Sequence, residues 1–263
     1  MIATMSAKVA VVYTCCHADP EVSNERFDWL GNFIYDLKPD YVIDLGDGAD
    51  MRSLNSYDTR YPQQIVTQSY EKDIECYNDA QERLRWRFRH AKRKKPYWIG
   101  LEGNHENRIK KAVQLDPRLE GQRYGVSFSH LQTDHWFNEY VPYENSAPGI
   151  IDLDGISYSH YFSSGNYGSA ISGTHHAYTI LQHRNHSSTC GHSHKRSVYF
   201  KDSAHPQGII GLVAGCYKGK DEAWAGQANQ EWWQGIVVKR EISNGMYEPE
   251  FISMETLKRE YGS

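Results

Sequence analysis

The sequence predicts an α/β protein in which two β-sheets pack face to face and helices lie outside them. Two observations support this prediction. In the first half of the chain, short apolar runs alternate with helical patterns, which is typical of strands paired in a parallel sheet. After about residue 149, β-like runs are joined by two-residue turn signals, which is typical of antiparallel hairpins.

The first half predicts three strands, each followed by a helix. The strands are expected at 8–14, 41–45 and 97–101. Asp19-Pro20 offers an N-cap followed by proline at the first helical position, so the first helix is expected to begin there. Lys38-Pro39 should end it. A second helix is expected over roughly 69–94 and a third after Asn104.

The second half predicts two hairpins and further strands. Asp154-Gly155 joins runs at 150–153 and 156–160, and Asn244-Gly245 marks another turn. Further β-like runs lie at 198–200, 209–213 and 236–238. The stretches 48–68, 117–148 and 217–234 show no regular pattern, and loops this long usually form functional walls or lids. We expect residues 1–263 to form a single domain.

The composition excludes several classes of protein. Of the 263 residues, 39% are hydrophobic and 24% charged, which is typical of a globular domain and not of a disordered chain. No apolar run approaches the roughly 20 residues that a membrane helix needs. Five cysteines are too few, and odd in number, for a disulfide framework. These features predict a cytoplasmic protein with no membrane partner.

The charge is unevenly distributed. The segment from Arg83 to Lys95 holds eight basic residues and no acidic one, although the whole chain has a net charge of −4. A basic segment on an acidic body is one feature of nucleic-acid binding. It is also found on the solvent-exposed face of a helix, and we favour that interpretation here. The apolar residues at helical spacing, which would pack inward, are Tyr70, Ile74, Tyr77, Leu84, Phe88 and Ala91.

Polar clusters follow the predicted strands. The first three are Thr14-Cys15-Cys16-His17, Gly46-Asp47-Gly48-Ala49-Asp50 and Gly103-Asn104-His105-Glu106. Ser159-His160 and Gly191-His192-Ser193-His194 come at the ends of later strands. Since the carboxyl ends of parallel strands share one edge of a sheet, the first three clusters should converge there.

These clusters contain the side chains that bind transition metals. Cys15 and His17 are two residues apart, as are His192 and His194, and such pairs project to the same side of an extended segment. The glycines before Asp47, Asn104 and His192 allow close approach of the backbone. This set of Cys, His, Asp and Asn suits zinc, manganese or iron better than calcium or magnesium.

In this order, the five clusters resemble the calcineurin-like metallophosphoesterases. The pattern of that family is Asp-x-His, Gly-Asp-x-x-Asp, Gly-Asn-His-Asp/Glu, a single His and then Gly-His-x-His. The match extends from the first strand to His194. The resemblance implies a four-layer αββα sandwich of two mixed β-sheets flanked by helices, which agrees with the fold expected above.

The resemblance also implies a site for two divalent transition-metal ions. One ion would be held by Cys15, His17, Asp47 and His194, and the other by Asp47, Asn104, His160 and His192. Asp47 would therefore bridge the two ions. His105 would not bind metal but would face the substrate, as a proton donor or as a stabiliser of charge in the transition state. Asp50 would orient His105.

One position departs from the family pattern. The family has Asp where this chain has Cys15. A thiolate keeps the negative charge but is softer, binds at about 2.3 Å and favours zinc. We expect Cys15 to replace the carboxylate as a ligand. The candidate metals are zinc, manganese, iron and nickel, with zinc favoured at the Cys15 position. Cys16 should point into the core.

The predicted activity is hydrolysis of a phosphate ester, in a small molecule or a nucleotide. Two ions roughly 3.5–4 Å apart can share a hydroxide nucleophile and hold a phosphate. His105 would help the leaving oxygen depart, and Arg108 is a candidate phosphate contact because its guanidinium matches phosphate geometry. A phosphodiesterase is preferred over a phosphomonoesterase, since no cationic pocket for a terminal dianionic phosphate is evident.

Two alternatives remain open. The basic segment and Trp224, Trp232 and Trp233, which could stack on bases, would also suit a nuclease acting on DNA or RNA. The tryptophans could equally fill a local apolar patch. An alternative of another class is a non-catalytic binding module whose metal site has degenerated, and Cys15 is the only feature that supports it.

Overall fold

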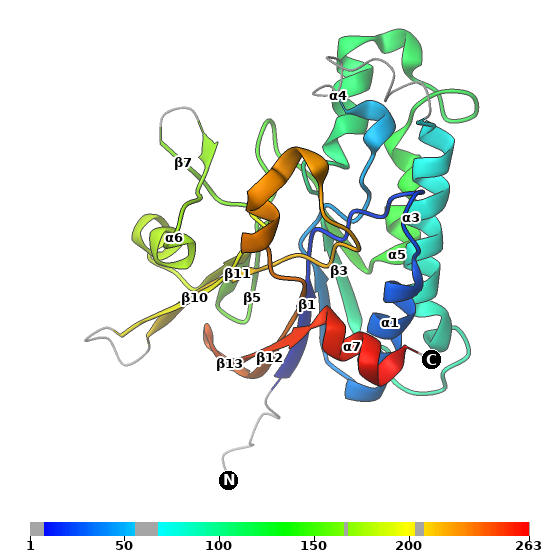
Figure 1. The fold of residues 1–263 in the computed structure, drawn as a ribbon. Helices are drawn as coiled ribbons and strands as arrows, with labels where there is room; N and C mark the ends of the chain where they lie inside the picture. Colours follow the sequence, from blue (N-terminus) through cyan, green and yellow to red (C-terminus); the bar gives the residue numbers. More distant parts are fainter. Residues whose placement is uncertain (1–7, 56–67, 166–167, 203–207, 263) are drawn as a thin grey trace.

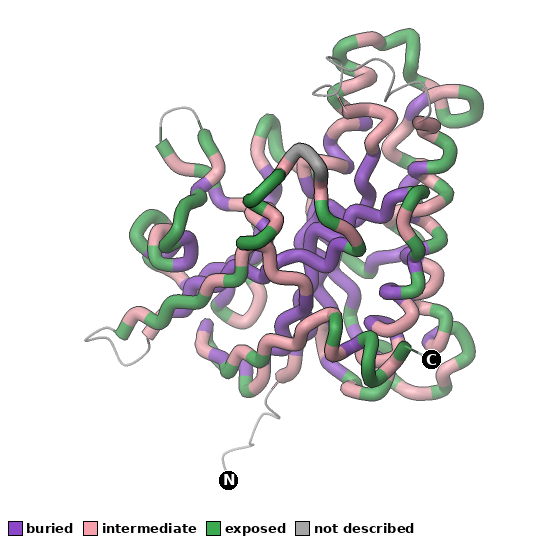
Figure 2. The backbone as a smooth tube through the Cα atoms, in the orientation of Figure 1, coloured by how far each residue is buried: buried purple, intermediate pink, exposed green. Residues whose placement is uncertain are grey.

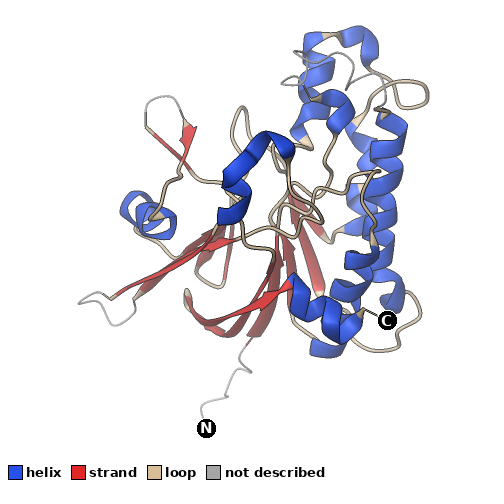
Figure 3. Ribbon diagram, in the orientation of Figure 1, coloured by secondary structure: helices blue, strands red, loops and turns tan. Residues whose placement is uncertain are grey.

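The computed structural model describes residues 8–55, 68–165, 168–202 and 208–262. Two mixed β-sheets lie between layers of helices, which confirms the predicted α/β sandwich (Figure 1, Figure 3). None of the helices within the described ranges is long and apolar enough to cross a membrane.

The first sheet has six strands in the order β13-β12-β1-β2-β3-β4. Its members are β1 (Lys8–Tyr13), β2 (Tyr41–Asp44), β3 (Tyr97–Leu101), β4 (Glu139–Val141), β12 (Gly235–Ser243) and β13 (Met246–Ser253). Strands β1 to β4 are parallel, whereas β12 runs antiparallel to both β1 and β13. All four parallel strands therefore end at the same edge.

The second sheet has five strands in the order β10-β11-β9-β6-β5. Its members are β5 (Ile151–Leu153), β6 (Ile156–Tyr158), β9 (Ser188–Cys190), β10 (Arg196–Lys201) and β11 (Ile209–Ala214). Strands β6, β9 and β11 are parallel to one another, with an antiparallel strand at each edge. A separate ribbon pairs β7 (Ser163–Ser164) with β8 (Ser169–Ala170).

Helices cover the outer faces of both sheets (Figure 1). The α-helices are α1 (Glu25–Leu37), α3 (Tyr70–Arg85), α4 (Asn107–Leu115), α5 (Thr133–Trp136), α6 (His176–Arg184) and α7 (Met254–Tyr261). Short 3₁₀ segments lie at Arg52–Leu54, Trp86–Phe88, Pro117–Leu119, Phe128–Leu131 and Ala223–Glu231. Helices α1, α3 and α7 pack on the first sheet, and α6 packs on the second.

Three apolar layers hold the sandwich together. Successive β1 residues point to opposite faces: Val11 packs under α1 and α3, while Ala10 and Val12 pack between the sheets. A third, smaller layer lies between α6 and the second sheet and includes Ile180 and Val213. Most residues of the central strands are accordingly buried (Figure 2). In this packing the carboxyl ends of β1, β2 and β3 lie next to one another, beside the second sheet.

The first predicted helix begins later than expected. Asp19 does not cap a helix, because its Oδ1 accepts a hydrogen bond from the Glu21 backbone nitrogen (2.9 Å) and its carboxylate pairs with Arg52 and Lys220. These contacts close a turn instead. Helix α1 begins at Glu25, and Asn24 occupies the N-cap position.

The basic helix ends earlier than expected. Helix α3 stops at Arg85, not near residue 94, and the chain then tightens into the 3₁₀ turn Trp86–Phe88. This turn buries Phe88 edge-on against Trp98 and Tyr35, at centroid distances of 5.8 and 5.3 Å. Burial of Tyr77, Leu84 and Phe88 confirms the inward face of the predicted stripe.

Strands β4, β7 and β8 were not predicted from the sequence. Strand β4 lies in the stretch 117–148 that showed no pattern, and it forms by pairing with the open edge of β3. Strands β7 and β8 have two residues each and pair with one another. Strand β9 directly precedes Gly191, where a strand end was expected, and all three of its residues are buried. In addition, the predicted Asn244-Gly245 hairpin joins the first sheet and not the second.

Candidate metal centre

The predicted polar clusters meet where β1, β2 and β3 end, toward the top of Figure 1. The loops after β1 and β2 are hydrogen-bonded through Cys15 N–H to Gly46 O and His17 N–H to Asp47 O, both 2.9 Å. A Cβ on Gly103 would lie 2.2 Å from the Asp47 backbone nitrogen. Gly46 has φ +97° and also contacts Gly103. The predicted close approach of the backbone is therefore confirmed for these two loops.

The buried carboxylate of Glu106 joins the same loops. It accepts hydrogen bonds from the backbone N–H groups of Asp47 (3.0 Å), Ala49 (2.9 Å) and Gly103 (3.0 Å). Burial, and then the neighbouring Asp47 carboxylate, raise the pKa of Glu106 to about 8. The sequence prediction gave Glu106 no role, although its position in Gly-Asn-His-Glu could have indicated one.

Five of the seven predicted ligands have a left-handed backbone conformation. They are Cys15, His17, Asp47, His192 and His194, with φ between 45° and 66°. Each such residue costs roughly 1–3 kcal/mol, and such strain concentrates at functional sites. The extended geometry that we expected for the two-apart pairs is therefore wrong. The side chains converge because of these turns.

The first group of candidate ligands contains Cys15, His17 and His194. Their ligand atoms all lie within 4.8 Å of one another. His17 donates from Nδ1 to Asp50 Oδ1 (2.9 Å), so its Nε2 lone pair faces His194 Nε2 at 3.2 Å. All three side chains are buried.

The second group surrounds His160. His160 donates from Nδ1 to the Leu45 carbonyl oxygen (2.8 Å), which leaves Nε2 as the ligand atom. That nitrogen lies 3.0 Å from Asn104 Oδ1, 3.2 Å from His192 Nδ1 and 3.2 Å from Asp47 Oδ2. His192 and His194 thus point to different groups.

Asp47 lies between the two groups. One set of possible ligands combines it with Cys15 and His160, and another combines it with His17 and His105, each within 4.8 Å. Burial opposes ionisation of Asp47, but His160 and His105 hold its pKa well below the usual value. The structure therefore places an ionised carboxylate where the bridging ligand is predicted.

The donor set fits metal ions. His17 Nε2 lies 3.2 Å from His194 Nε2, and His160 Nε2 lies beside Asn104 Oδ1 and Asp47 Oδ2, so atoms that can each ligate a metal converge in both groups. Burial, and then the electrostatic influence of the neighbouring His160, lower the pKa of His192 to about 4. Burial and Lys218 lower that of His194 to about 3. Neutral imidazoles of this kind are the form that binds transition metals.

Asp50 contacts two of the predicted site histidines. Its Oδ1 lies 2.9 Å from His17 Nδ1 and 3.1 Å from His105 Nδ1. Burial alone would raise the pKa of Asp50, but these histidines hold it well below the usual value. Asp50 is thus placed to orient His17 as well as His105, and the first of these roles was not predicted.

His105 and Arg108 lie side by side at the rim of the site. Arg108 donates from Nη1 to the Asp50 (2.9 Å) and Met51 (3.3 Å) carbonyl oxygens, and its Nη2 lies 3.2 Å from His105 Nε2. The His105 ring packs edge-on against His17 at a centroid distance of 4.4 Å. His105 is partly exposed, as a residue facing substrate must be.

Two residues outside the predicted set contact or influence the ligands. Trp232, which follows the 3₁₀ segment Ala223–Glu231, packs edge-on against His194 at a centroid distance of 4.4 Å. Lys218 is buried, forms an ion pair with Glu222 and lowers the pKa of His17 and His194. The sequence analysis considered Trp232 only for base stacking or for an apolar patch, and Lys218 lies in no sequence pattern that would have revealed it.

The structure also shows the surroundings of Trp233 and of the cysteines. Trp233 packs against Phe251 and Arg196, which supports the apolar-patch interpretation, while the side chain of Trp224 lies outside the described residues. The five cysteines, all within the described ranges, are free thiols. Cys16 packs in the core under α1, as expected.

The basic segment forms ion pairs within the molecule. The pairs are Arg83 with Asp28 and Asp79, Arg87 with Asp36, Arg89 with Glu82, and Lys94 with Asp40. Arg85 is stacked over Trp98, 4.1 Å from the ring centroid, instead of pointing to solvent. These contacts reduce the free positive charge available to a nucleic acid.

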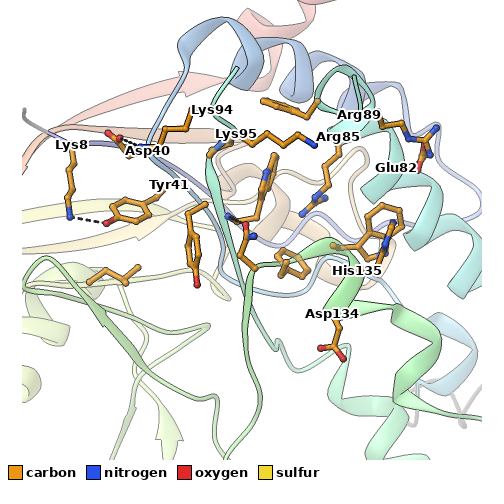
Figure 4. A pocket seen from close by; sticks show the side chains of 18 residues that line it. Lys8, Asp40, Tyr41, Glu82, Arg85, Arg89, Lys94, Lys95, Asp134 and His135 are labelled. Atoms are coloured by element: carbon orange, nitrogen blue, oxygen red, sulfur yellow. Dashed lines mark hydrogen bonds and ion pairs between the residues drawn. The ribbon is translucent and has the colours of Figure 1, made fainter. Parts of the chain in front are cut away.

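A cavity of about 990 Å³ lies beside this segment (Figure 4). It is lined by the first residues of β2 and β3, Tyr41 and Tyr97, and by Arg85, Arg89 and Lys94. These strand starts are at the opposite edge of the sheet from the metal ligands. The cavity therefore takes no part in the candidate metal centre.

Comparison with known proteins adds one structural likeness. No family model matches the chain, and no curated protein matches it. The chain is similar to a solved structure of a conserved uncharacterized protein from Streptococcus pneumoniae, described as a predicted phosphoesterase. The two are 11% identical over 96% of this chain and 92% of that chain, with a TM-score of 0.39. Evidence for function must therefore come from the site itself.

Proposed function

We propose that this protein is a metal-dependent phosphoesterase, and within that class a phosphodiesterase. The observation that carries the proposal is the pair of adjacent donor groups on either side of Asp47. The donors come from the five sequence clusters that resemble the calcineurin-like metallophosphoesterases. Two divalent transition-metal ions would be held there, one by Cys15, His17, Asp47 and His194, and the other by Asp47, Asn104, His160 and His192.

Three residues of the chain would act on the substrate or orient a residue that does. Bound at this site, two ions would supply Lewis acidity toward the phosphoryl oxygens and lower the pKa of water. His105 lies at the rim within reach of a substrate and would donate a proton to the leaving oxygen. Arg108 Nη2 lies beside His105 Nε2 and would contact the same phosphate. Asp50 would hold the His105 ring through Nδ1.

The proposal is tested by hydrolysis of bis(p-nitrophenyl) phosphate. The protein would be stripped of metal and supplied in turn with zinc, manganese, nickel or iron. We expect turnover to return with metal and to fall roughly 10²–10⁴-fold in His105→Ala, the range for loss of a general acid. His130→Ala is the matched control, because His130 contacts Tyr70 and Gln122, away from the metal ligands.

Other outcomes identify the alternatives. Faster release of p-nitrophenol from p-nitrophenyl phosphate than from the diester would identify a phosphomonoesterase. Cleavage of DNA or RNA with no action on small diesters would identify a nuclease. Folded protein that binds fewer than two ions and hydrolyses none of these substrates would be a binding module, and the proposal would be wrong.

A further inference from the structure

Cys15 belongs to both groups of candidate ligands. Its Sγ lies within 4.8 Å of the ligand atoms of His17 and His194. The same Sγ lies within 4.8 Å of the ligand atoms of Asp47, which lies between the groups, and of His160, which belongs to the second group. The family pattern assigns position 15 to the first ion alone, so the proximity of Cys15 Sγ to His160 is not part of that pattern.

Two polar groups flank the sulfur. The backbone N–H of His192 donates to Cys15 Sγ over 3.3 Å, and the Thr14 hydroxyl lies 3.2 Å away. An N–H donor stabilises negative charge on sulfur. Because His192 belongs to the second group, its N–H ties the sulfur to that side of the site. Cys15 is fully buried, and its left-handed backbone (φ 49°) restricts where Sγ can point.

We propose that the Cys15 thiolate is a second bridging ligand, bound to both metal ions, alongside the carboxylate of Asp47. This inference rests on the proposed function, since it requires two ions. A thiolate has lone pairs for two metals and binds each at about 2.3 Å. Metal binding would release the thiol proton to solvent, and sulfur would ligate both ions. Both positions would then prefer soft, late metals such as zinc and cadmium over manganese.

The test is a ¹H–¹¹³Cd correlation spectrum of the full chain loaded with two equivalents of ¹¹³Cd. Through-bond coupling across sulfur connects a cadmium nucleus to the β-protons of the cysteine that binds it. We expect two ¹¹³Cd signals that both correlate with the same pair of β-protons, those of Cys15. Two signals of which only one correlates would show a terminal thiolate and overturn the inference.

The outcomes separate this inference from the proposed function. Restored diesterase activity together with a single correlation would leave the function standing and reject the bridge. Binding of fewer than two cadmium ions would reject both. In Cys15→Asp the correlations should vanish and both ¹¹³Cd signals should move upfield, toward oxygen and nitrogen ligation. Cys16→Ala is the matched control: it removes the neighbouring core thiol and should leave both correlations intact, whereas their loss would show that Cys16 is the ligand.

Discussion

Asp50 contacts two histidine rings of the candidate site at once. Its carboxylate accepts from His17 and His105, and its carbonyl oxygen lies 2.7 Å from His105 Nδ1. A histidine that donates from Nδ1 to a carboxylate presents Nε2 to a metal in a fixed orientation. Loss of Asp50 should therefore weaken metal binding as well as turnover.

We predict that Asp50→Asn lowers zinc affinity roughly 10–100-fold, the usual effect of losing a partner of a metal-binding histidine. Competition with a chromophoric chelator measures this directly. Asp116→Asn removes a partly exposed carboxylate that pairs with Arg118, away from the metal ligands, and should leave the affinity unchanged. Wild-type zinc affinity in Asp50→Asn would show that His17 does not depend on Asp50.

At the scale of elements, the loops after β2 and β3 are held together more tightly than their sequences alone reveal. Glu106 accepts three backbone N–H groups, and Gly103 leaves no room for a side chain beside Asp47. The neighbour at Gly103 is backbone, which cannot rotate away. The position of Asp47 therefore depends on the absence of a Cβ at residue 103.

We predict that Gly103→Ala destabilises the protein by at least about 3 kcal/mol and impairs metal binding, since the added carbon would overlap the Asp47 backbone nitrogen. Urea unfolding of the metal-free protein measures the loss. Gly121→Ala is the control, because the nearest atom to its added carbon is 3.3 Å away. Equal stability of the two variants would contradict the close packing of these loops.

The end of α3 bears on the nuclease alternative. Four of the eight basic residues in 83–95 form ion pairs within the molecule. We predict that binding of a fluorescent oligonucleotide is weak, and that hydrolysis of the small diester changes less than about twofold between 50 and 200 mM salt. Binding that falls steeply over that range would instead identify a phosphate-contacting surface.

At the scale of the whole molecule, burial of neutral histidines makes the free energy of unfolding depend on pH. The pKa values of His192 and His194 fall to about 4 and about 3, whereas in the unfolded chain they return near 6.5. Between these values the unfolded state binds more protons than the native state. The stability contributed by these histidines is therefore fully present above pH 6.5 and is lost as pH falls toward 4.

We predict that the unfolding free energy of the metal-free protein decreases by roughly 1–3 kcal/mol per buried histidine between pH 6.5 and 4.5. Urea unfolding in the presence of a chelator at several pH values measures it. His192→Gln should show a shallower decrease. His160 behaves differently, because Asp47 raises its pKa despite burial. The stability that His160 contributes is present below pH 6.5 and is lost as the pH rises above that value. A stability independent of pH over this window would show that the site histidines titrate normally.

Much of the fold was predictable because its signals are local. Apolar runs of strand length, turn pairs such as Asp154-Gly155 and the helical stripe of α3 depend on neighbours in the chain. Strands β4, β7 and β8 were not predictable, because these short segments show no local pattern and form only by pairing with β3 or with one another. The start of α1 was misplaced because Asp19 makes its ion pairs with Arg52 and Lys220, both distant in sequence.

The sequence by itself determined the donor types, their order and their place after the strands, because these follow from residue identity and from short-range pattern. The family resemblance carried by those donors also gave His192 and His194 to different ions. Only the tertiary structure placed Asp50 against His17 and brought the sulfur of Cys15 within reach of both donor groups. The physical reason is that the left-handed turns and the register between loops are set by contacts among residues far apart in the chain, which no local pattern records.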